Sequence, residues 1–178
     1  MKIIVAGTGF VGLTHAAVCS EYGHEVYAYD IDERKLNAYR STDPDQIGHY
    51  VNEPGLPGII AENNERYLFF TNDIESNIEG TDAIFLCLPT PPNVDGSSDL
   101  SYYFKAVDYI CTLLAKREDT RRVVLINKST VPIGTARQLE RKLRACCDSL
   151  GLRVLGWFAS PIQGGDGNRE FFIHAQQP

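Results

Sequence analysis

The sequence predicts an α/β fold in which a doubly wound, mainly parallel sheet carries helices on both faces. Short runs rich in Val, Ile, Leu, Phe and Tyr alternate along the chain with longer segments of helical period. Several runs are nearly continuous in apolar residues, as expected for parallel strands buried on both faces. Strand–helix alternation of this kind builds right-handed βαβ units, which is why we expect a doubly wound sheet.

Six strands and four helices account for most of the chain in this prediction. The expected strands are 2–6, 25–29, 67–70, 83–88, 123–127 and 153–158. Apolar residues recur every three or four positions in the expected helices, which are 11–22, 33–39, 100–116 and 134–150. Residues 41–58 are rich in Pro and Gly and predict a long loop or a short-helix excursion. Residues 90–99 form a second expected loop, directly after the fourth strand.

Composition restricts the classes of function. The chain has 178 residues, with 17 Lys and Arg against 23 Asp and Glu, and a net charge of −6. This length suits one domain, and the acidic balance disfavours nucleic acid as a partner. No apolar run approaches the ~18 residues of a membrane span, so no membrane partner is expected. Five cysteines without metal-ligand spacing, and a start without an export signal, predict reduced thiols, a cytoplasmic location and no metal site.

A glycine fingerprint follows the first expected strand and opens the first expected helix. Its six residues are Gly7, Thr8, Gly9, Phe10, Val11 and Gly12. In a Rossmann-like fold, Gly7 permits the tight turn, Gly9 lets the backbone approach a pyrophosphate, and Gly12 lets the helix pack on the sheet. The positive end of the helix favours the anion. A glycine turn without a ligand is the alternative, but the strand before and the helix after favour dinucleotide binding.

An acidic residue at the end of the second expected strand points to the cofactor. Asp30 lies 18 residues after Gly12, where such folds place the carboxylate that binds the adenosine ribose. A carboxylate there repels a 2′-phosphate, so NAD is expected rather than NADP. The alternative for Asp30 is an N-cap of the helix that begins near Asp32. Lys35 is either a ribose or pyrophosphate contact or a solvated surface lysine.

Further motifs follow the fingerprint in order. The fourth strand is expected to end in LPTPP, and the fifth in KSTVP, and each places a threonine beside rigid prolines. Prolines that end strands and threonines that cap turns would explain each motif alone. Together with EPGL at 53–56 and DLSY at 99–102, however, these motifs closely resemble the N-terminal domain of the UDP-glucose/GDP-mannose dehydrogenase family over residues 1–158. The resemblance is nearest to the UDP-glucose branch.

The resemblance implies a cofactor, a reaction and site residues. NAD contacts would fall on Gly7 to Gly12, Asp30, Lys35, Thr90 and Thr130, and Thr130 would also help order water beside the reacting carbon. The complete family enzyme oxidises the C6 alcohol of a UDP-sugar to a carboxylate with two NAD, through a thiohemiacetal and a thioester on a cysteine thiolate. UDP-glucose is the favoured substrate, and GDP-mannose and UDP-N-acetylmannosamine stay open.

The sequence departs from the family near its end. At 159–165 it reads ASPIQGG, without the family's glutamate, and none of the five cysteines matches the nucleophile of the family's C-terminal domain. We therefore expect an NAD-binding dehydrogenase domain at 1–158 and a divergent tail at 159–178, for which frameshift and truncation both stay open. Within this tail, residues 161–178 have no clear period and are expected not to pack. The chain alone is expected to lack turnover.

The alternatives to this interpretation are few. One is a stand-alone NAD-binding remnant without catalysis. Another is a Rossmann dehydrogenase of the hydroxyacyl-CoA or phosphogluconate type, which the EPGL and KSTVP motifs disfavour. The resemblance also implies a central helix and a second domain that cover an apolar face of this domain. Without that cover we expect self-association, and with it a homo-oligomer.

Overall fold

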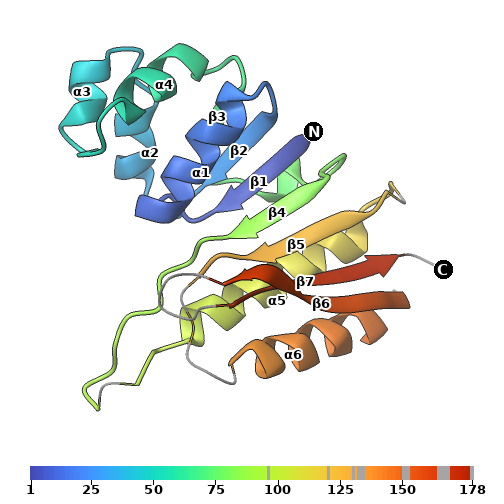
Figure 1. Ribbon diagram of the computed structural model, residues 1–178. Helices are drawn as coiled ribbons and strands as arrows, with labels where there is room; N and C mark the ends of the chain where they lie inside the picture. The colour runs from blue at the N-terminus through green and yellow to red at the C-terminus, as the bar shows by residue number, and fades with distance from the viewer. Residues whose placement is uncertain are drawn as a thin grey trace.

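A computed structural model describes residues 1–95, 97–119, 121–129, 131, 135–149, 153–163 and 169–176. Within these residues the chain forms a seven-stranded sheet in the order β3-β2-β1-β4-β5-β7-β6 (Figure 1). The strands are β1 (Lys2–Ala6), β2 (Glu25–Tyr29), β3 (Leu68–Thr71), β4 (Ala83–Leu86), β5 (Val123–Asn127), β6 (Arg153–Gln163) and β7 (Arg169–Gln176). The helices are α1 (Phe10–Glu21), α2 (Glu33–Tyr39), α3 (Pro44–Gly48), α4 (Leu56–Asn63), the 3₁₀ turn η1 (Glu75–Asn77), α5 (Ser101–Lys116) and α6 (Thr135–Ser149).

Five of the strands are parallel, which confirms the predicted fold class. Strand β1 pairs in parallel with β2 and β4, β2 pairs with β3, and β4 pairs with β5. The chain builds outward from β1 to β3, then crosses to the other side of β1 to place β4 and β5. The strand order therefore reverses between β1 and β4, and a crevice opens at the carboxyl ends of the strands at such a point.

Each face of the sheet has its own apolar core. Leu13, Ala16 and Ala17 of α1 pack with residues of α2, α4 and the first three strands on one face. Tyr103, Val107 and Ile110 of α5 pack on the other face against β1, β4 and β5. Because both faces are covered there, β1 is buried along almost its whole length, and this explains its continuous apolar sequence.

Residues 41–58 adopt the short-helix alternative. Asp43 caps α3 by accepting a hydrogen bond from the amide of Asp45, and Pro44 takes the first helical position, where a missing N–H costs nothing. Gly55 precedes α4 with a φ of 83°, a left-handed conformation that favours glycine. Pro44 and Gly55 thus stand at the starts of α3 and α4.

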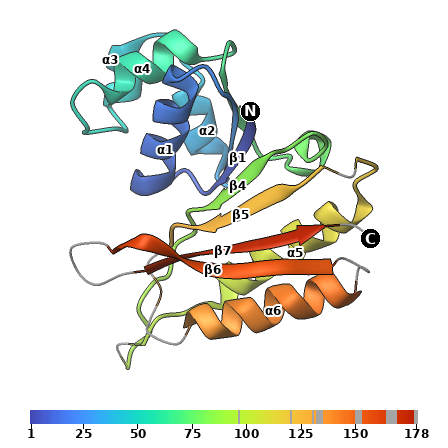
Figure 2. The same ribbon diagram turned by 45° about the vertical axis from the view of Figure 1, so that its right-hand side comes forward.

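The expectation that residues 161–178 do not pack is wrong for 161–163 and 169–176, which lie in strands. Strand β6 extends to Gln163, and β7 inserts between β5 and β6, antiparallel to both (Figure 2). The pairing of β7 with β5 runs from Val123 opposite Ala175 to Ile126 opposite Phe172. Consecutive Phe171, Phe172 and Ile173 favour an extended strand, a signal that the sequence prediction passed over.

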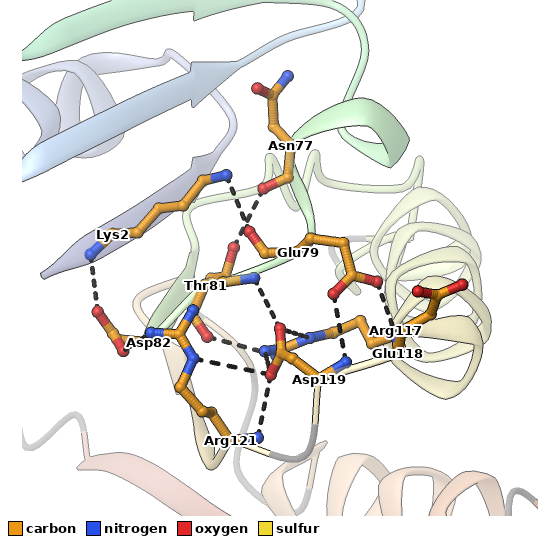
Figure 3. Close-up of polar contacts among 10 residues, drawn as sticks. Lys2, Asn77, Glu79, Thr81, Asp82, Arg117, Glu118, Asp119 and Arg121 are labelled. Atoms are coloured by element: carbon orange, nitrogen blue, oxygen red, sulfur yellow. Dashed lines mark hydrogen bonds and ion pairs between the residues drawn. The ribbon is translucent and has the colours of Figure 1, made fainter.

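A cluster of charged residues joins the amino ends of β1, β4 and β5 (Figure 3). Arg117, which is 6% exposed, forms an ion pair with Asp119 and donates from Nη1 to the carbonyl of Thr81 at 3.3 Å. Asp119 Oδ2 also accepts from the amide of Gly80 at 2.7 Å. The Lys2 amide donates to Asp82 Oδ2 at 2.8 Å. This cluster links the amino ends of these strands, at the end of the sheet opposite the crevice.

In the described ranges, no helix has both the length and the apolar character required to cross a membrane.

Candidate dinucleotide-binding site

A cleft of about 760 Å³ opens at the carboxyl ends of the parallel strands. Its walls come from the fingerprint, the end of β2, the segments that follow β4 and β5, and one face of α5. Seven of the predicted site residues line it, namely Gly7, Gly9, Phe10, Val11, Asp30, Lys35 and Thr90. Thr8 and Gly12, the other two residues of the fingerprint, are buried and do not line the cleft. Thr130 lies outside the described residues.

Two of the fingerprint glycines are required by the protein itself. Gly7 has a φ of 100°, and a Cβ there would clash with the carbonyl group of Cys87. A Cβ on Gly12 would clash with the carbonyl oxygen of Gly7 and lie 2.9 Å from Cys87 Cβ. These two glycines therefore let α1 approach β1 and β4 closely.

Gly9 is under no such constraint. It is the N-cap of α1 with a φ of −69° and a ψ of −176°, a conformation open to any residue. A Cβ on Gly9 would meet no protein atom within 4 Å. The bare backbone at this helix start instead faces the cleft, where a pyrophosphate can accept hydrogen bonds from free N–H groups. The residues present thus fit a dinucleotide.

Asp30 is held in place by hydrogen bonds to the fingerprint. Its Oδ2 accepts from the amide of Thr8 at 2.9 Å and from the Thr8 hydroxyl at 2.7 Å, and its Oδ1 accepts from the amide of Asp32 at 3.0 Å. Burial works to raise the pKa of Asp30, but these bonds and the charge of Lys35 together bring the pKa below its ordinary value. Asp30 is therefore a fixed carboxylate at the cleft wall.

The N-cap alternative for Asp30 does not hold, because Asp32 is the N-cap of α2. The Asp32 side chain accepts from the amide of Arg34 at 3.0 Å. Asp30 instead lies two positions before this N-cap and lines the cleft. Lys35, on the first turn of α2, lines the same wall, so it lies beside the place expected for the ribose.

Sequence reasoning missed one wall of the cleft, which α5 supplies. Tyr102, Lys105, Ala106 and Tyr109 recur at three- and four-residue spacing and line the cleft together. Tyr102 is 62% exposed, so an aromatic ring is presented openly at the cleft edge. The helical spacing was visible in the sequence, but nothing showed which face of this helix would meet the strand ends.

The described cysteines stand mostly apart from the cleft. Cys87 lines it and is buried beneath Gly7 and Gly12. Cys111 and Cys147 are buried, and burial raises the pKa of the Cys19 thiol. Among the residues that the structure describes, no three His, Cys, Asp or Glu side chains form a group that could hold a metal ion.

The fold and this cleft together define a dinucleotide-binding domain of the Rossmann class. The sequence also matches the model of the UDP-glucose/GDP-mannose dehydrogenase family, NAD binding domain, over residues 1–154. The chain belongs to this family, which confirms the resemblance seen in its motifs, and the domain is one that binds NAD.

Individual relatives agree with this assignment. The chain is 36% identical over 146 residues to a UDP-glucose 6-dehydrogenase of Rhizobium meliloti. The matched stretch covers 81% of this chain and 31% of the relative. A solved UDP-glucose dehydrogenase from Pyrobaculum islandicum matches with a TM-score of 0.67 and 31% identity over 81% of this chain and 32% of that one. A solved GDP-mannose dehydrogenase from Pseudomonas aeruginosa matches with a TM-score of 0.67 and 27% identity. This match covers 82% of this chain and 32% of that one. The chain thus spans about a third of the length of each.

Proposed function

We propose that this chain binds NAD in the cleft between the fingerprint and the strand ends, as the cofactor domain of a UDP-glucose 6-dehydrogenase. The observation that carries the proposal is the open backbone at Gly9 beside the fixed carboxylate of Asp30. The first accommodates a pyrophosphate, and the second accepts hydrogen bonds from ribose hydroxyls. Lys35, Thr90 and Thr130 complete the proposed contacts, and Thr130 keeps its proposed role beside the reacting carbon.

The carboxylate of Asp30 also decides between the two nicotinamide dinucleotides. Because hydrogen bonds hold its pKa below the ordinary value, Asp30 carries a full negative charge at neutral pH. A 2′-phosphate placed against that charge would be repelled, and Asp30 cannot turn away without losing its bonds to Thr8. NAD is therefore preferred over NADP.

Titration calorimetry of the chain with NAD and NADP tests this proposal. We expect NAD to bind, NADP to bind at least ~10-fold more weakly, and Asp30→Ala to weaken NAD binding by about 10-fold or more, as for a lost hydrogen bond to a charged group. Asp73→Ala is the matched control, because Asp73 also follows a strand and accepts hydrogen bonds from Ser76, but does not line the cleft. A folded wild-type sample that binds no NAD would refute the proposal.

We propose further that the chain by itself does not turn over a sugar nucleotide. Bound NAD supplies a hydride acceptor, but oxidation to a carboxylate through a thioester also needs a cysteine thiolate beside the sugar. Of the described cysteines only Cys87 lines the cleft, and it is buried against Gly7 and Gly12. NADH absorbance with NAD and UDP-glucose is expected to stay at background, and steady NADH production would contradict this.

UDP-glucose is the proposed substrate of the complete family enzyme to which this domain corresponds, because relatives of more than 30% identity bear the name UDP-glucose dehydrogenase. GDP-mannose and UDP-N-acetylmannosamine are the alternatives, and the first has support from a matching solved structure. Comparing the three sugar nucleotides as ligands of the NAD-loaded chain by calorimetry distinguishes them.

Residues 159–178 are sequence that diverges from the family, and translation of the other two reading frames tests a frameshift origin. A cytoplasmic location suits the reduced thiols expected of five cysteines. Self-association is proposed because an apolar face of this domain would lack the cover that the family's second domain gives it, and sedimentation of a concentrated sample tests it, with a pure monomer as the contrary outcome.

A further inference from the structure

A polar pair is buried in the otherwise apolar layer between α5 and the sheet. The Tyr103 hydroxyl donates to Asn127 Oδ1 at 3.1 Å, and the two residues are 0% and 4% exposed. The neighbours of Tyr103 in this layer include Ile84, Leu86 and Val107, so a phenylalanine would suit the surroundings better than a tyrosine. Burying two polar groups costs free energy that their mutual hydrogen bond only roughly offsets. The pair is therefore not explained by packing.

The pair continues toward the cleft through Ser129. Asn127 Oδ1 also accepts from the amide of Ser129 at 3.1 Å. The Ser129 hydroxyl in turn donates to the carbonyl of Leu86 at 3.1 Å and accepts from the amide of Leu88 at 2.8 Å. A chain of hydrogen bonds thus runs from the buried face of α5, through the last residue of β5, to the segment after β4.

These bonds stand where the ladder between β4 and β5 ends. The last paired residues are Leu86 and Asn127, and beyond them the Lys128 amide still donates to the Leu86 carbonyl at 2.9 Å. Leu88 has left the ladder, and the Ser129 side chain supplies the partner for its amide. Leu88 and Ser129 both line the cleft, so their positions set the shape of its wall at these strand ends.

We infer that Tyr103 and Asn127 are positioning residues that act through Ser129 to fix the nicotinamide end of the cleft. The inference rests on the proposed binding of NAD. A dinucleotide spans the two halves of such a sheet, so with the adenosine ribose at Asp30 beyond β2, the nicotinamide half lies over the ends of β4 and β5. Neither Tyr103 nor Asn127 lines the cleft, and their effect passes through Ser129 and Leu88.

Comparing NADH with ADP-ribose tests this assignment in the full chain. ADP-ribose keeps the adenosine and pyrophosphate of the cofactor but has no nicotinamide. For Tyr103→Phe we expect about 3- to 10-fold weaker NADH binding, the size of one lost hydrogen bond, and a smaller gain in NADH fluorescence on binding. ADP-ribose affinity is expected to stay within ~2-fold of wild type. Tyr27→Phe is the matched control, since its hydroxyl donates to Glu25 and its side chain does not line the cleft.

Ser129→Ala provides a second, independent entry into the same chain of bonds. It should also weaken NADH binding while leaving ADP-ribose binding nearly unchanged. In the double variant Tyr103→Phe with Ser129→Ala, NADH affinity should fall by no more than it does in the weaker-binding single variant, because both substitutions break the same chain of hydrogen bonds. Equal weakening of NADH and ADP-ribose, or no change in either, would overturn the inference. Wild-type protein that binds neither ligand would instead refute the proposed function on which it rests.

Discussion

The three glycines of the fingerprint have different reasons to be glycine. Gly7 and Gly12 are required by clashes inside the protein, whereas Gly9 has open space on the side where a Cβ would lie. The fold can therefore tolerate a side chain at Gly9, and only a ligand would oppose one. This contrast separates the contribution of the fingerprint to stability from its contribution to binding.

Gly9→Ala and Gly12→Ala test that separation directly. For Gly9→Ala we expect the unfolding free energy to change by less than about 1 kcal/mol, because its φ of −69° suits alanine. NAD affinity should nevertheless fall about 10-fold or more. Gly12→Ala should cost about 1–3 kcal/mol of stability through overpacking, whether or not NAD is present. Urea unfolding and calorimetry measure the two quantities, and a Gly9→Ala protein with undiminished NAD affinity would contradict a pyrophosphate at this position.

The hydrogen bonds of Asp30 predict how stability depends on pH. Its pKa is lowered in the folded chain, so its contribution to stability is complete above the unfolded value of about 3.9 and is lost as the pH falls through the folded pKa. Asp30→Ala should be destabilised by about 1–3 kcal/mol at pH 7, and the gap to wild type should narrow below about pH 4. Thr8→Val keeps the amide donor but loses the hydroxyl, and we expect an intermediate profile. A gap that is independent of pH in urea unfolding would exclude this account.

At the scale of the elements, the periodicity of the sequence determined most of the fold. The bounds of β1, β2, β5 and α2 agree with the prediction to the residue, because each is a compact apolar run or a helix with a clear cap. For residues 41–58 local Pro and Gly signals allowed both a loop and short helices, and the packing of Ile47 and Leu56 into the core decided for helices. Strand β7 was not predicted, because three glycines at 164, 165 and 167 are typical of irregular backbone and the apolar run at 171–173 that follows them is short.

The candidate site was predicted less evenly than the fold. Local motifs placed Gly7, Gly9 and Asp30 at one cleft, because strand, turn and helix are adjacent in sequence there. The contributions of Tyr103 and Ser129 depend on where α5 packs against the sheet and on the pairing of β4 with β5, a long-range arrangement that spacing along the chain does not encode.

The charged cluster at the amino ends of the strands gives a prediction at the same scale. Asp119→Ala would leave the Arg117 guanidinium buried without its carboxylate, so we expect the free energy of unfolding to fall by about 3 kcal/mol. This value is at the lower end for a buried ion pair because Asp119 is partly exposed. Arg121→Ala should cost under about 1 kcal/mol, since Arg121 is 58% exposed and its nearest carboxylate contacts are 3.8 and 3.9 Å away. Urea unfolding of both variants checks this. Equal losses of unfolding free energy in the two variants would contradict this, because they would show that the burial of Arg117 does not set the cost of removing an ion-pair partner.

At the scale of the whole molecule, the C-terminal segment closes one side of the sheet. Because β7 lies between β5 and β6, the final strand in sequence is not the final strand in space (Figure 2). Strand β6 meets the rest of the sheet through β7, with backbone pairing on both sides. The parallel core that carries the fingerprint, from β3 to β4, has no strand pairing with β7. The two halves of the sheet thus depend on the C-terminal residues to different degrees.

Deleting residues 164–178 should therefore destabilise the chain without removing the adenosine end of the cleft. Loss of the β7 ladder leaves β6 unpaired and exposes the edge of β5, so we expect a cost of about 3 kcal/mol or more, roughly 6–12 °C in Tm. Deletion of residues 177–178 alone, which follow the end of β7, is the control and should leave Tm nearly unchanged. ADP-ribose should still bind the shortened chain at temperatures where it is folded, because Asp30 and Gly9 lie on the other half of the sheet. An unchanged Tm after removal of 164–178 would contradict this, because it would mean that β7 takes no part in the cooperative fold. In that case the amides of β5 would be equally protected from hydrogen exchange in the full-length and the shortened chain.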